Sequence, residues 1–508
     1  MTHRATPKAA YIELLRACLA RSADKPAVRY QGRDILAGEF LASIFRYARA
    51  LASIGIGRGS LVALFAPNSP DALAIRYATN LLGAGAVFLS VPRSNQRRAE
   101  LLTQIDPTLL VVFRETSALL PDGITIPVAV VGTTGTDALP RLDELAASQP
   151  SDPMPSLARP GDLAVIISSG GTTGVPKGSW RDFTAYTAMV DVPSPADRRQ
   201  LVNGRLAYLS QVLVDITLLG GGCVVLKPGY DAADTLATIE SERITDLFLV
   251  EPQLFDIMDH PDVSRRDLSS LRALSHIGAS APPTLRRRAR ARLGPRLAHS
   301  YGASEMGIVS SLSPAEYGST RPQVFTSAGR VHPGVDVRLR REDGTLAGPG
   351  KAGSIEVRSL AMAGGYWHSP ALQAERFRAG WYHSGDLGRL DADGYLHILG
   401  RAADVTWQGG VMVSPTLLED TLCRLPEVRY AVVVPDQDTG SWVAAVVAWP
   451  GLSVDPARYR DAIAARYGAE VAAAQVIVPL ERVPLTEQGK PDREAIRTCA
   501  RQDGVASA

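Results

Sequence analysis

The sequence predicts an α/β fold in which a large region of layered α/β subdomains is followed by a smaller, β-rich subdomain. Between residues 5 and 155, short apolar runs alternate with amphipathic helical patterns, which is typical of a mostly parallel sheet covered by helices. The proline-rich stretch 150–160 predicts a linker, and a second α/β unit is expected from Asp162 to about Ser311. After Gly329 the turns lie close together, which predicts shorter strands.

The individual elements are expected in chain order. Those of the first unit are Tyr11–Leu19, Leu61–Ala66, Ala72–Leu82, Ala86–Val91 and Leu109–Val112. The most apolar stretch of the second unit, 206–226, contains Gln211, Asp215 and three consecutive glycines, so it predicts a buried strand and helix and not a membrane span. In the β-rich part, turns are expected at Pro333-Gly334, Asp343-Gly344 and Asp393-Gly394.

The composition excludes several classes of protein. The chain has 508 residues with 54 basic and 52 acidic side chains, a net charge of +2 that calls for no nucleic-acid partner. A hydrophobic content of 45%, with 45 glycines and 35 prolines, excludes disorder, collagen and coiled coil. The four cysteines form no Cys-x-x-Cys pair, and Glu13, Arg16 and Arg21 interrupt the apolar pattern of a signal peptide. We therefore expect a cytoplasmic protein.

Two features concern the basic residues. The arginine-rich run 286–292 spreads its charges around a helix while Leu285, Ala289 and Leu293 form an apolar stripe, so it predicts a solvated surface helix, with an anion-binding patch as the alternative. Of the 54 basic residues only six are lysine. A lysine inside a chemical motif is therefore informative.

A loop rich in Gly, Ser and Thr follows an apolar strand at 163–167. Such a loop offers backbone N–H groups and hydroxyls to phosphate and ends in a lysine, although Pro176 excludes a Walker A motif. Its candidate phosphate-binding residues are Ser168, Ser169, Gly170, Gly171, Thr172, Thr173, Gly174 and Lys177. This segment closely resembles the phosphate loop of the adenylate-forming superfamily, which includes acyl-CoA synthetases, peptide-synthetase adenylation domains and firefly luciferase.

The resemblance extends over essentially the whole chain, in the order in which the family has its motifs. The matching segments are Asn68-Ser69-Pro70 with 83–86, Gly278-Ala279-Ser280, Tyr301-Gly302-Ala303-Ser304-Glu305, 381–386, Asp393-Gly394-Tyr395, Gly400-Arg401 and 484–493. It implies an N-terminal AMP-binding domain at 1–400, with subdomains of about 1–155, 156–320 and 321–400. It also implies a small, mobile C-terminal α+β domain at 401–508.

The resemblance implies a reaction and its residues. A carboxylate attacks the α-phosphorus of ATP to give acyl-AMP and pyrophosphate, and the thiol of coenzyme A then attacks the acyl carbon. Catalytic roles fall to Lys490, Glu305 and Ser304, with Glu305 also binding Mg²⁺. Further nucleotide or coenzyme contacts are implied for Gly278, Ala279, Ser280, Tyr301, Gly302, Asp386, Tyr395, Arg401, Gly409 and Gly410. The Asp386 carboxylate can accept from both ribose hydroxyls, and Tyr301 offers a flat face to adenine.

The chain departs from the family pattern at three places, and a fourth residue, Asp215, needs separate interpretation. The hinge position, usually Asp or Lys, is Ala403, and the first glutamate expected after Pro415 is Leu417, although Glu419 is kept. No histidine follows the aromatic Tyr208 at the mouth of the acyl pocket, where Gln211 lies nearby. Asp215 faintly resembles an amine-binding aspartate, with a buried or capping role as the preferred interpretation.

With no clear amine anchor, the sequence favours a hydrophobic carboxylic acid as substrate. The segments 208–215, 250–255, 276–280 and 302–308 are expected to line its pocket. Four alternatives stay open at this point: an enzyme competent in only one half-reaction, with another enzyme supplying or using the acyl-AMP; transfer to a separate carrier protein; a non-catalytic nucleotide-binding protein; and an oxidative, luciferase-like activity.

Overall fold

The first large sheet contains seven strands and is built mainly from the N-terminal third of the chain. The computed structural model describes residues 9–92, 94–132, 139–169, 177–277, 282–318, 321–408, 410–436 and 438–505. The strand order is β18-β8-β7-β4-β3-β5-β6. The bounds are β3 Leu61–Phe65, β4 Gly85–Phe88, β5 Leu109–Phe113, β6 Val128–Val131, β7 Leu163–Ser169, β8 Lys177–Asp182 and β18 Gly365–Tyr366. The strands β3 to β7 pair in parallel, which confirms the predicted layered α/β fold.

Helices cover this sheet, and the one carrying the early Asn-Ser-Pro motif shows how the sequence fixes their ends. The bounds are α1 Tyr11–Arg21, α2 Ala37–Ser53, α3 Pro70–Leu81, α4 Asn95–Ile105, α5 Leu142–Ala147 and α6 Phe183–Val190. The α3 helix begins after Ser69, whose hydroxyl accepts from the Ala72 amide at 3.2 Å, and Pro70 occupies the first helical position, where no amide donor is needed.

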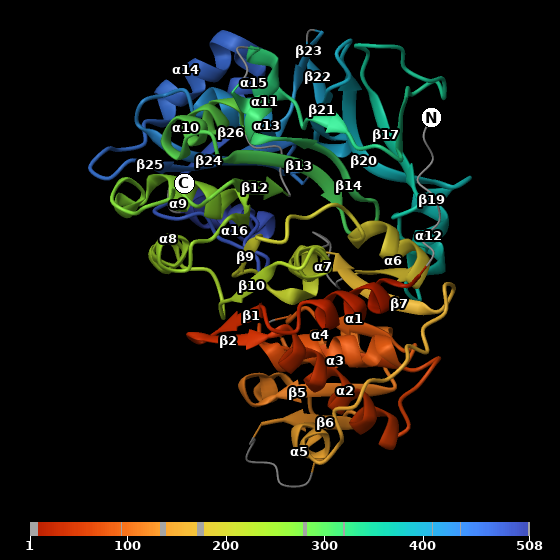
Figure 1. Ribbon diagram of the computed structural model, residues 1–508. Helices are drawn as coiled ribbons and strands as arrows, with labels where there is room; N and C mark the ends of the chain where they lie inside the picture. Colours follow the sequence, from red (N-terminus) through yellow and green to blue (C-terminus); the bar gives the residue numbers. More distant parts are fainter. Residues whose placement is uncertain are drawn as a thin grey trace.

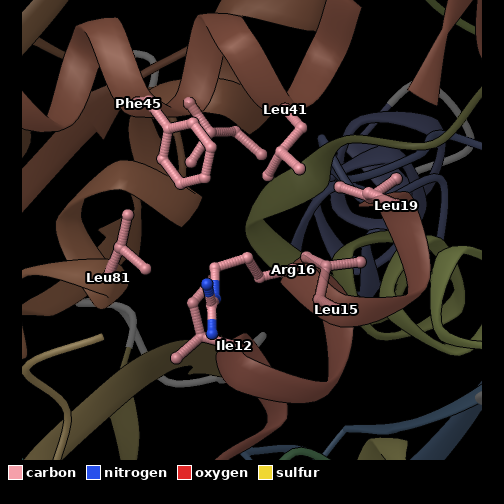
Figure 2. Close-up of a pocket in the computed structure, with 8 residues that line it drawn as sticks. Ile12, Leu15, Arg16, Leu19, Leu41, Phe45 and Leu81 are labelled. Carbon is pink, nitrogen blue, oxygen red and sulfur yellow. The ribbon is translucent and has the colours of Figure 1, made fainter. Parts of the chain in front are cut away.

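A small pocket between α1, α2 and α3 is a packing contact rather than a site. Figure 2 shows aliphatic and aromatic side chains of the three helices turned toward one another, with Arg16 beside them. The lining residues are Ile12, Leu15, Arg16, Leu19, Leu41, Ile44, Phe45 and Leu81. This set offers no carboxylate, hydroxyl or thiol, so its role is to dock α1 by burying apolar surface.

The second large sheet has nine strands and includes a hairpin from the N-terminal region. Its order is β15-β14-β13-β12-β11-β9-β10-β1-β2. The bounds are β1 Pro26–Tyr30, β2 Arg33–Leu36, β9 Arg199–Val202, β10 Cys223–Leu226, β11 Asp246–Val250, β12 Ala273–Ile277, β13 Leu297–Ala303, β14 Gly307–Leu312 and β15 Arg330–Val331. Because β1 pairs with β10 while β7 and β8 complete the first sheet, the two sheets exchange strands across residue 155.

The helices of this second region are α7 Gln211–Leu219, α8 Ala232–Ser241, α9 Glu251–Asp259, α10 Pro283–Leu293 and α11 Pro314–Tyr317. The apolar stretch 206–226 forms a π-helical turn, α7 and β10, as predicted. None of the helices in the described ranges is long and apolar enough to cross a bilayer.

An antiparallel sheet follows and confirms the predicted β-rich subdomain. It contains β16 Val335–Arg340, β17 Gly353–Ser359, β19 Phe377–Arg378, β20 Trp381–Leu390 and β21 Leu396–Arg401, with the short helix α12 at Pro370–Arg376. The long strand β20 pairs with β17, β19 and β21, so it lies inside the sheet.

The C-terminal region forms a small α+β unit that shares a core with the second large sheet. Its elements are β22 Thr406–Gln408, β23 Val411–Val413, α13 Pro415–Leu422, β24 Val428–Asp436, β25 Ser441–Ala448, α14 Pro456–Tyr467, α15 Ala469–Ala473, β26 Gln475–Pro479 and α16 Arg493–Val505. Figure 1 shows α13, β24 and β25 of this unit beside α9 and α10. Across this boundary the rings of Phe255 and Tyr430 lie 5.0 Å apart, and Arg429 pairs with Asp259 at 2.9 Å. The two parts are therefore in contact through both apolar and charged residues.

Candidate active site

Asp386 is a buried carboxylate held by two donors from different elements. It lies on β20 with only 8% of its surface exposed. The Tyr301 hydroxyl donates to one carboxylate oxygen at 2.6 Å, and the Nε atom of Arg401 lies 3.2 Å from the other. Burial raises the pKa of Asp386, while the Arg401 cation and the Tyr301 hydrogen bond oppose that rise. The structure therefore brings together three residues that the sequence predicted separately.

The hairpin β13–β14 carries Tyr301 and turns directly beyond it. Gly302 faces Ile308 across the hairpin, and a Cβ atom on Gly302 would lie 2.4 Å from the Gly307 carbonyl oxygen. Only glycine allows the two strands to approach this closely. The predicted Gly302 thus sets the shape of the turn that presents Ser304 and Glu305.

Glu305 is buried and held by hydroxyls on both carboxylate oxygens. Ser304 Oγ donates to one at 2.9 Å, and the Tyr366 hydroxyl donates to the other at 2.9 Å. Each oxygen keeps a free lone pair, and hard carboxylate oxygens beside phosphates are what Mg²⁺ prefers, so Glu305 fits the predicted metal role. Within the described ranges no group of three His, Cys, Asp or Glu side chains could hold a metal ion, so Glu305 would share it with substrate phosphates.

The phosphate loop connects two adjacent antiparallel strands. Ser169 at the end of β7 pairs with Lys177 at the start of β8, and the buried Ser168 pairs with Gly178. Strand β8 contacts the glutamate hairpin, because Ser179 Oγ donates to the Ser304 carbonyl at 3.0 Å. The predicted residues Gly170, Gly171, Thr172, Thr173 and Gly174 lie outside the described residues.

Lys490 reaches the site from the C-terminal unit. Burial lowers the pKa of Lys490, the nearby Arg401 cation lowers it further, and the Glu305 charge opposes that effect. The lysine thus lies within electrostatic range of residues on β21 and the β13–β14 turn. Five predicted residues, Lys490, Glu305, Asp386, Tyr301 and Arg401, therefore form one cluster.

The predicted hinge region connects this cluster to the start of the last helix. Ala403 lies in the short 3₁₀ turn Ala402–Asp404, and Asp404 is buried. Arg493 pairs with the Asp404 carboxylate at 2.8 Å. Although the hinge residue itself is an alanine, its neighbour thus holds a polar contact with the lysine motif.

The remaining residues predicted to contact the nucleotide or coenzyme A are Tyr395 and Gly410, which the structure describes, and four residues that lie outside the described ranges. The Tyr395 hydroxyl donates to Glu316 at 3.2 Å, and the Arg330 guanidinium lies over the Tyr395 ring at 4.4 Å, so Tyr395 supports the second sheet. Gly410, with φ of +78°, forms the turn between β22 and β23. Gly278, Ala279, Ser280 and Gly409 lie outside the described residues.

Asp215 is a structural residue, as the preferred interpretation held. It is fully buried, and its carboxylate accepts from Arg76 at 2.6 Å and from the hydroxyls of Tyr186 at 2.6 Å and Tyr77 at 2.5 Å. Three donors satisfy the carboxylate inside the core, so it is not available to bind a substrate amine.

The arginine-rich helix α10 corrects one prediction. The apolar stripe of Leu285, Ala289 and Leu293 is buried as expected, but Arg286 is only 3% exposed. Its Nη2 atom donates to the Tyr317 hydroxyl at 2.6 Å and to the Ser327 carbonyl at 2.8 Å. The prediction of a solvated face was therefore wrong for Arg286, because the Tyr317 hydroxyl on α11 and the Ser327 carbonyl supply enough acceptors to bury a guanidinium.

Sequence reasoning missed the residues that support Glu305 from behind. The Tyr366 hydroxyl binds its carboxylate, and Arg181 donates to the Ala361 and Glu305 carbonyls at 2.8 and 3.4 Å. Both lie on strands β8 and β18, which pair although their sequence positions are far apart. No local pattern marks such a pair.

Comparison with known proteins identifies the family. The model of the AMP-binding enzyme family matches residues 15–367, and the chain belongs to this family. This agrees with the predicted adenylate-forming superfamily and with an enzyme of the acid–thiol ligase class.

The similar proteins include ligases with named acids. The medium/long-chain-fatty-acid–CoA ligase FadD8 of Mycobacterium tuberculosis is 31% identical over 95% of this chain and 89% of its own length. A feruloyl-CoA synthase of Amycolatopsis is also 31% identical, over 83% of this chain and 85% of its own length. Among solved structures, the amide bond synthetase McbA of Marinactinospora thermotolerans superposes with a TM-score of 0.84 at 29% identity, covering 96% of this chain and 99% of its own.

Proposed function

We propose that this chain converts a hydrophobic carboxylic acid, ATP and coenzyme A into an acyl-CoA through an acyl-AMP intermediate. The observation that carries the proposal is the position of Lys490, half-buried at the end of a loop from the C-terminal unit and within electrostatic range of Arg401 and Glu305. A compact cation at this point can contact both the acid and the α-phosphate. The proposal includes a 401–508 domain that moves between the two steps, and a reducing, cytoplasmic location that suits four free cysteines.

In the first step, a carboxylate oxygen of the acid attacks the α-phosphorus of ATP. The new oxygen–phosphorus bond forms as the bond to the β-phosphate oxygen breaks, and pyrophosphate leaves. Negative charge grows on the phosphate oxygens, so Lys490 and the N–H donors of the phosphate loop lower the barrier. Asp386 orients the nucleotide by accepting from its ribose hydroxyls, and Tyr301 and Arg401 hold that carboxylate in place.

Glu305, steadied by Ser304 and Tyr366, would hold Mg²⁺. When bound, this ion supplies positive charge against the β- and γ-phosphates. In the second step the thiol sulfur attacks the acyl carbon, AMP leaves through cleavage of its bond to that carbon, and the thiol proton passes to solvent. The turn at Gly410 lies in the segment that resembles the family's thiol channel.

The substrate class rests on two arguments. Asp215 is satisfied by core donors and offers no amine anchor, which favours an acid without an α-amino group. Two of the similar ligases are named for medium- and long-chain fatty acids and for the feruloyl group, which share a large apolar body.

A second candidate is amide formation, in which an amine attacks the same acyl-AMP. This candidate is supported by the similarity of the chain to the amide bond synthetase McbA over nearly the whole of both chains. The first half-reaction is identical in the two cases, so the acceptor distinguishes them.

Mass spectrometry of parallel reactions tests the proposal. One reaction contains ATP, Mg²⁺, coenzyme A and a panel of aliphatic, aromatic and polycyclic acids, and a second contains preformed acyl-AMP and coenzyme A without ATP. Matched reactions replace coenzyme A with a carrier protein or with amines. We expect acyl-CoA in both of the first two reactions. Thioester from the preformed adenylate alone would refute the first step, and amide without thioester would support the second candidate.

A further inference from the structure

The loop that delivers Lys490 is a tight turn fixed by its own hydrogen bonds. The Thr486 amide donates to the Lys490 carbonyl at 2.8 Å, and the Gly489 amide donates to the Thr486 carbonyl at 2.9 Å. A bridge between Leu485 and Pro491 closes its base. Because these hydrogen bonds fix the turn internally, a contact that holds Glu487 also orients Lys490.

The tip of this turn contacts two segments of the N-terminal part. Gly489 adopts φ of +76°, and a Cβ atom there would lie 3.0 Å from Val250 and 3.1 Å from the Gln253 amide nitrogen. A side chain at this position would therefore push the loop away from α9. The close approach shows that the loop is seated against α9 and not merely near it.

Glu487 makes the polar contacts of the same loop with the N-terminal part. Its two carboxylate oxygens accept from the Val91 amide at 3.1 and 2.9 Å, and the Tyr208 hydroxyl donates to one of them. Burial, followed by the Glu487 charge, raises the pKa of Tyr208, which keeps the phenol protonated as a donor. Hydrogen bonds to a charged acceptor are the stronger kind.

These contacts oppose an electrostatic cost. Inserting the half-buried Lys490 brings a second cation near the Arg401 guanidinium, and Glu305 offsets this repulsion only in part, since the pKa of Lys490 remains lowered. An attachment outside the site can hold the loop in place without adding charge beside the phosphates. Glu487, three residues from Lys490 and exposed at the boundary between the two units, provides such an attachment.

We infer that Glu487 and Tyr208 form a clamp between the two domains that positions Lys490 for acyl-AMP formation and opens for thiol transfer. Both are positioning residues, since they act through the lysine loop. The inference rests on the proposed two-step function. It assigns to Tyr208, which begins the segment expected to line the acid pocket, a contact that the first half-reaction requires and the second does not.

The test compares Glu487→Gln, Tyr208→Phe and the double variant in the two half-reactions. Glu487→Gln keeps the size of the side chain but removes its charge, and Tyr208→Phe removes one hydroxyl. We expect kcat for pyrophosphate formation to fall about tenfold in Glu487→Gln, with KM for ATP within about twofold of the original, because a lost charge-assisted bond is worth about one order of magnitude. Acyl transfer from preformed acyl-AMP to coenzyme A should keep its rate.

The double variant and a matched control complete the design. If the two residues act as one clamp, the double variant should lose no more than Glu487→Gln alone. Glu481→Gln, an exposed glutamate earlier in the same domain, should behave as the original protein. An original protein that releases no pyrophosphate would refute the proposed function itself. Clamp variants with unchanged pyrophosphate formation, or with equal losses in both half-reactions, would overturn the clamp alone.

Discussion

At the scale of single residues, Asp386 shows how the fold keeps a buried carboxylate available to accept hydrogen bonds. The Tyr301 hydroxyl and the Arg401 guanidinium approach different oxygens, and the backbone amide of Asp386 donates to Ser384 Oγ at 3.0 Å. The group is fixed in position while both oxygens keep lone pairs for a ribose.

We predict that Asp386→Asn lowers ATP use by about ten- to a hundredfold, since an amide loses the charge-assisted bonds worth about 1.5–3 kcal/mol. ATP–pyrophosphate exchange at varied ATP concentration measures this. Asp343→Asn, at an exposed turn, is the matched control and should retain full activity. Equal exchange rates in the two variants would show that Asp386 does not bind the nucleotide.

The types of the central residues could be predicted from the sequence, but their supports could not. Asp386, Glu305 and Lys490 each lie in a local sequence motif, so the neighbouring residues indicate their chemistry. Tyr366 and Arg181 act through a strand pairing between distant positions, and Arg286 is buried by acceptors on α11 and on a neighbouring loop. Local pattern contains no information on such tertiary contacts.

At the scale of elements, the hairpin β13–β14 determines where the residues proposed to contact adenine and Mg²⁺ lie. It carries Tyr301 before the turn and Ser304 and Glu305 within it, and Gly302 allows its two strands to approach. The sequence predicted β3, β4, β5 and β7 of the first sheet and the buried strand β10 of the second, but not that β1 and β2 would join the second sheet. Residue alternation fixes that a segment is a strand, whereas its partner depends on the whole chain.

We expect Gly302→Ala to destabilise the fold by about 1–3 kcal/mol, because the added methyl group must displace the Gly307 backbone. The melting temperature and the rate of ATP–pyrophosphate exchange should both fall. The control is Gly348→Ala, where no atom lies within 4 Å of the added carbon. If the two alanine variants unfold at the same temperature, the hairpin does not need its close approach.

At the scale of the whole molecule, the buried Glu251 and the half-buried Glu419 interact between the N-terminal part and the C-terminal unit. Glu251 begins α9, Glu419 lies on α13, and Tyr430 on β24 bonds to Glu251. Burial, and then the Glu419 charge, raises the pKa of Glu251. Burial also raises the pKa of Glu419, against the Val433 amide and the Arg493 cation. The Arg286 cation opposes the rise at Glu251.

The form in which the C-terminal unit packs against α9 therefore binds more protons than a form in which the two parts are separated or unfolded. Its extra stability is complete below the ordinary glutamate pKa of about 4.3 and is lost as pH rises through the raised values. We predict that the melting temperature falls more steeply between about pH 5 and pH 8 in the original protein than in Glu419→Gln. Glu470→Gln, an exposed glutamate of the same unit, should keep the original slope. Parallel slopes for all three proteins would rule out this contribution.

In the proposed mechanism Lys490, delivered by the C-terminal unit, serves the first half-reaction and not the second. Lys490→Ala tests it most directly, with pyrophosphate release and acyl transfer from preformed acyl-AMP measured in the same preparation. We predict at least about a hundredfold loss of pyrophosphate release, as for removal of a group that stabilises transition-state charge, with thiol transfer largely retained. Undiminished pyrophosphate release in this variant would contradict it.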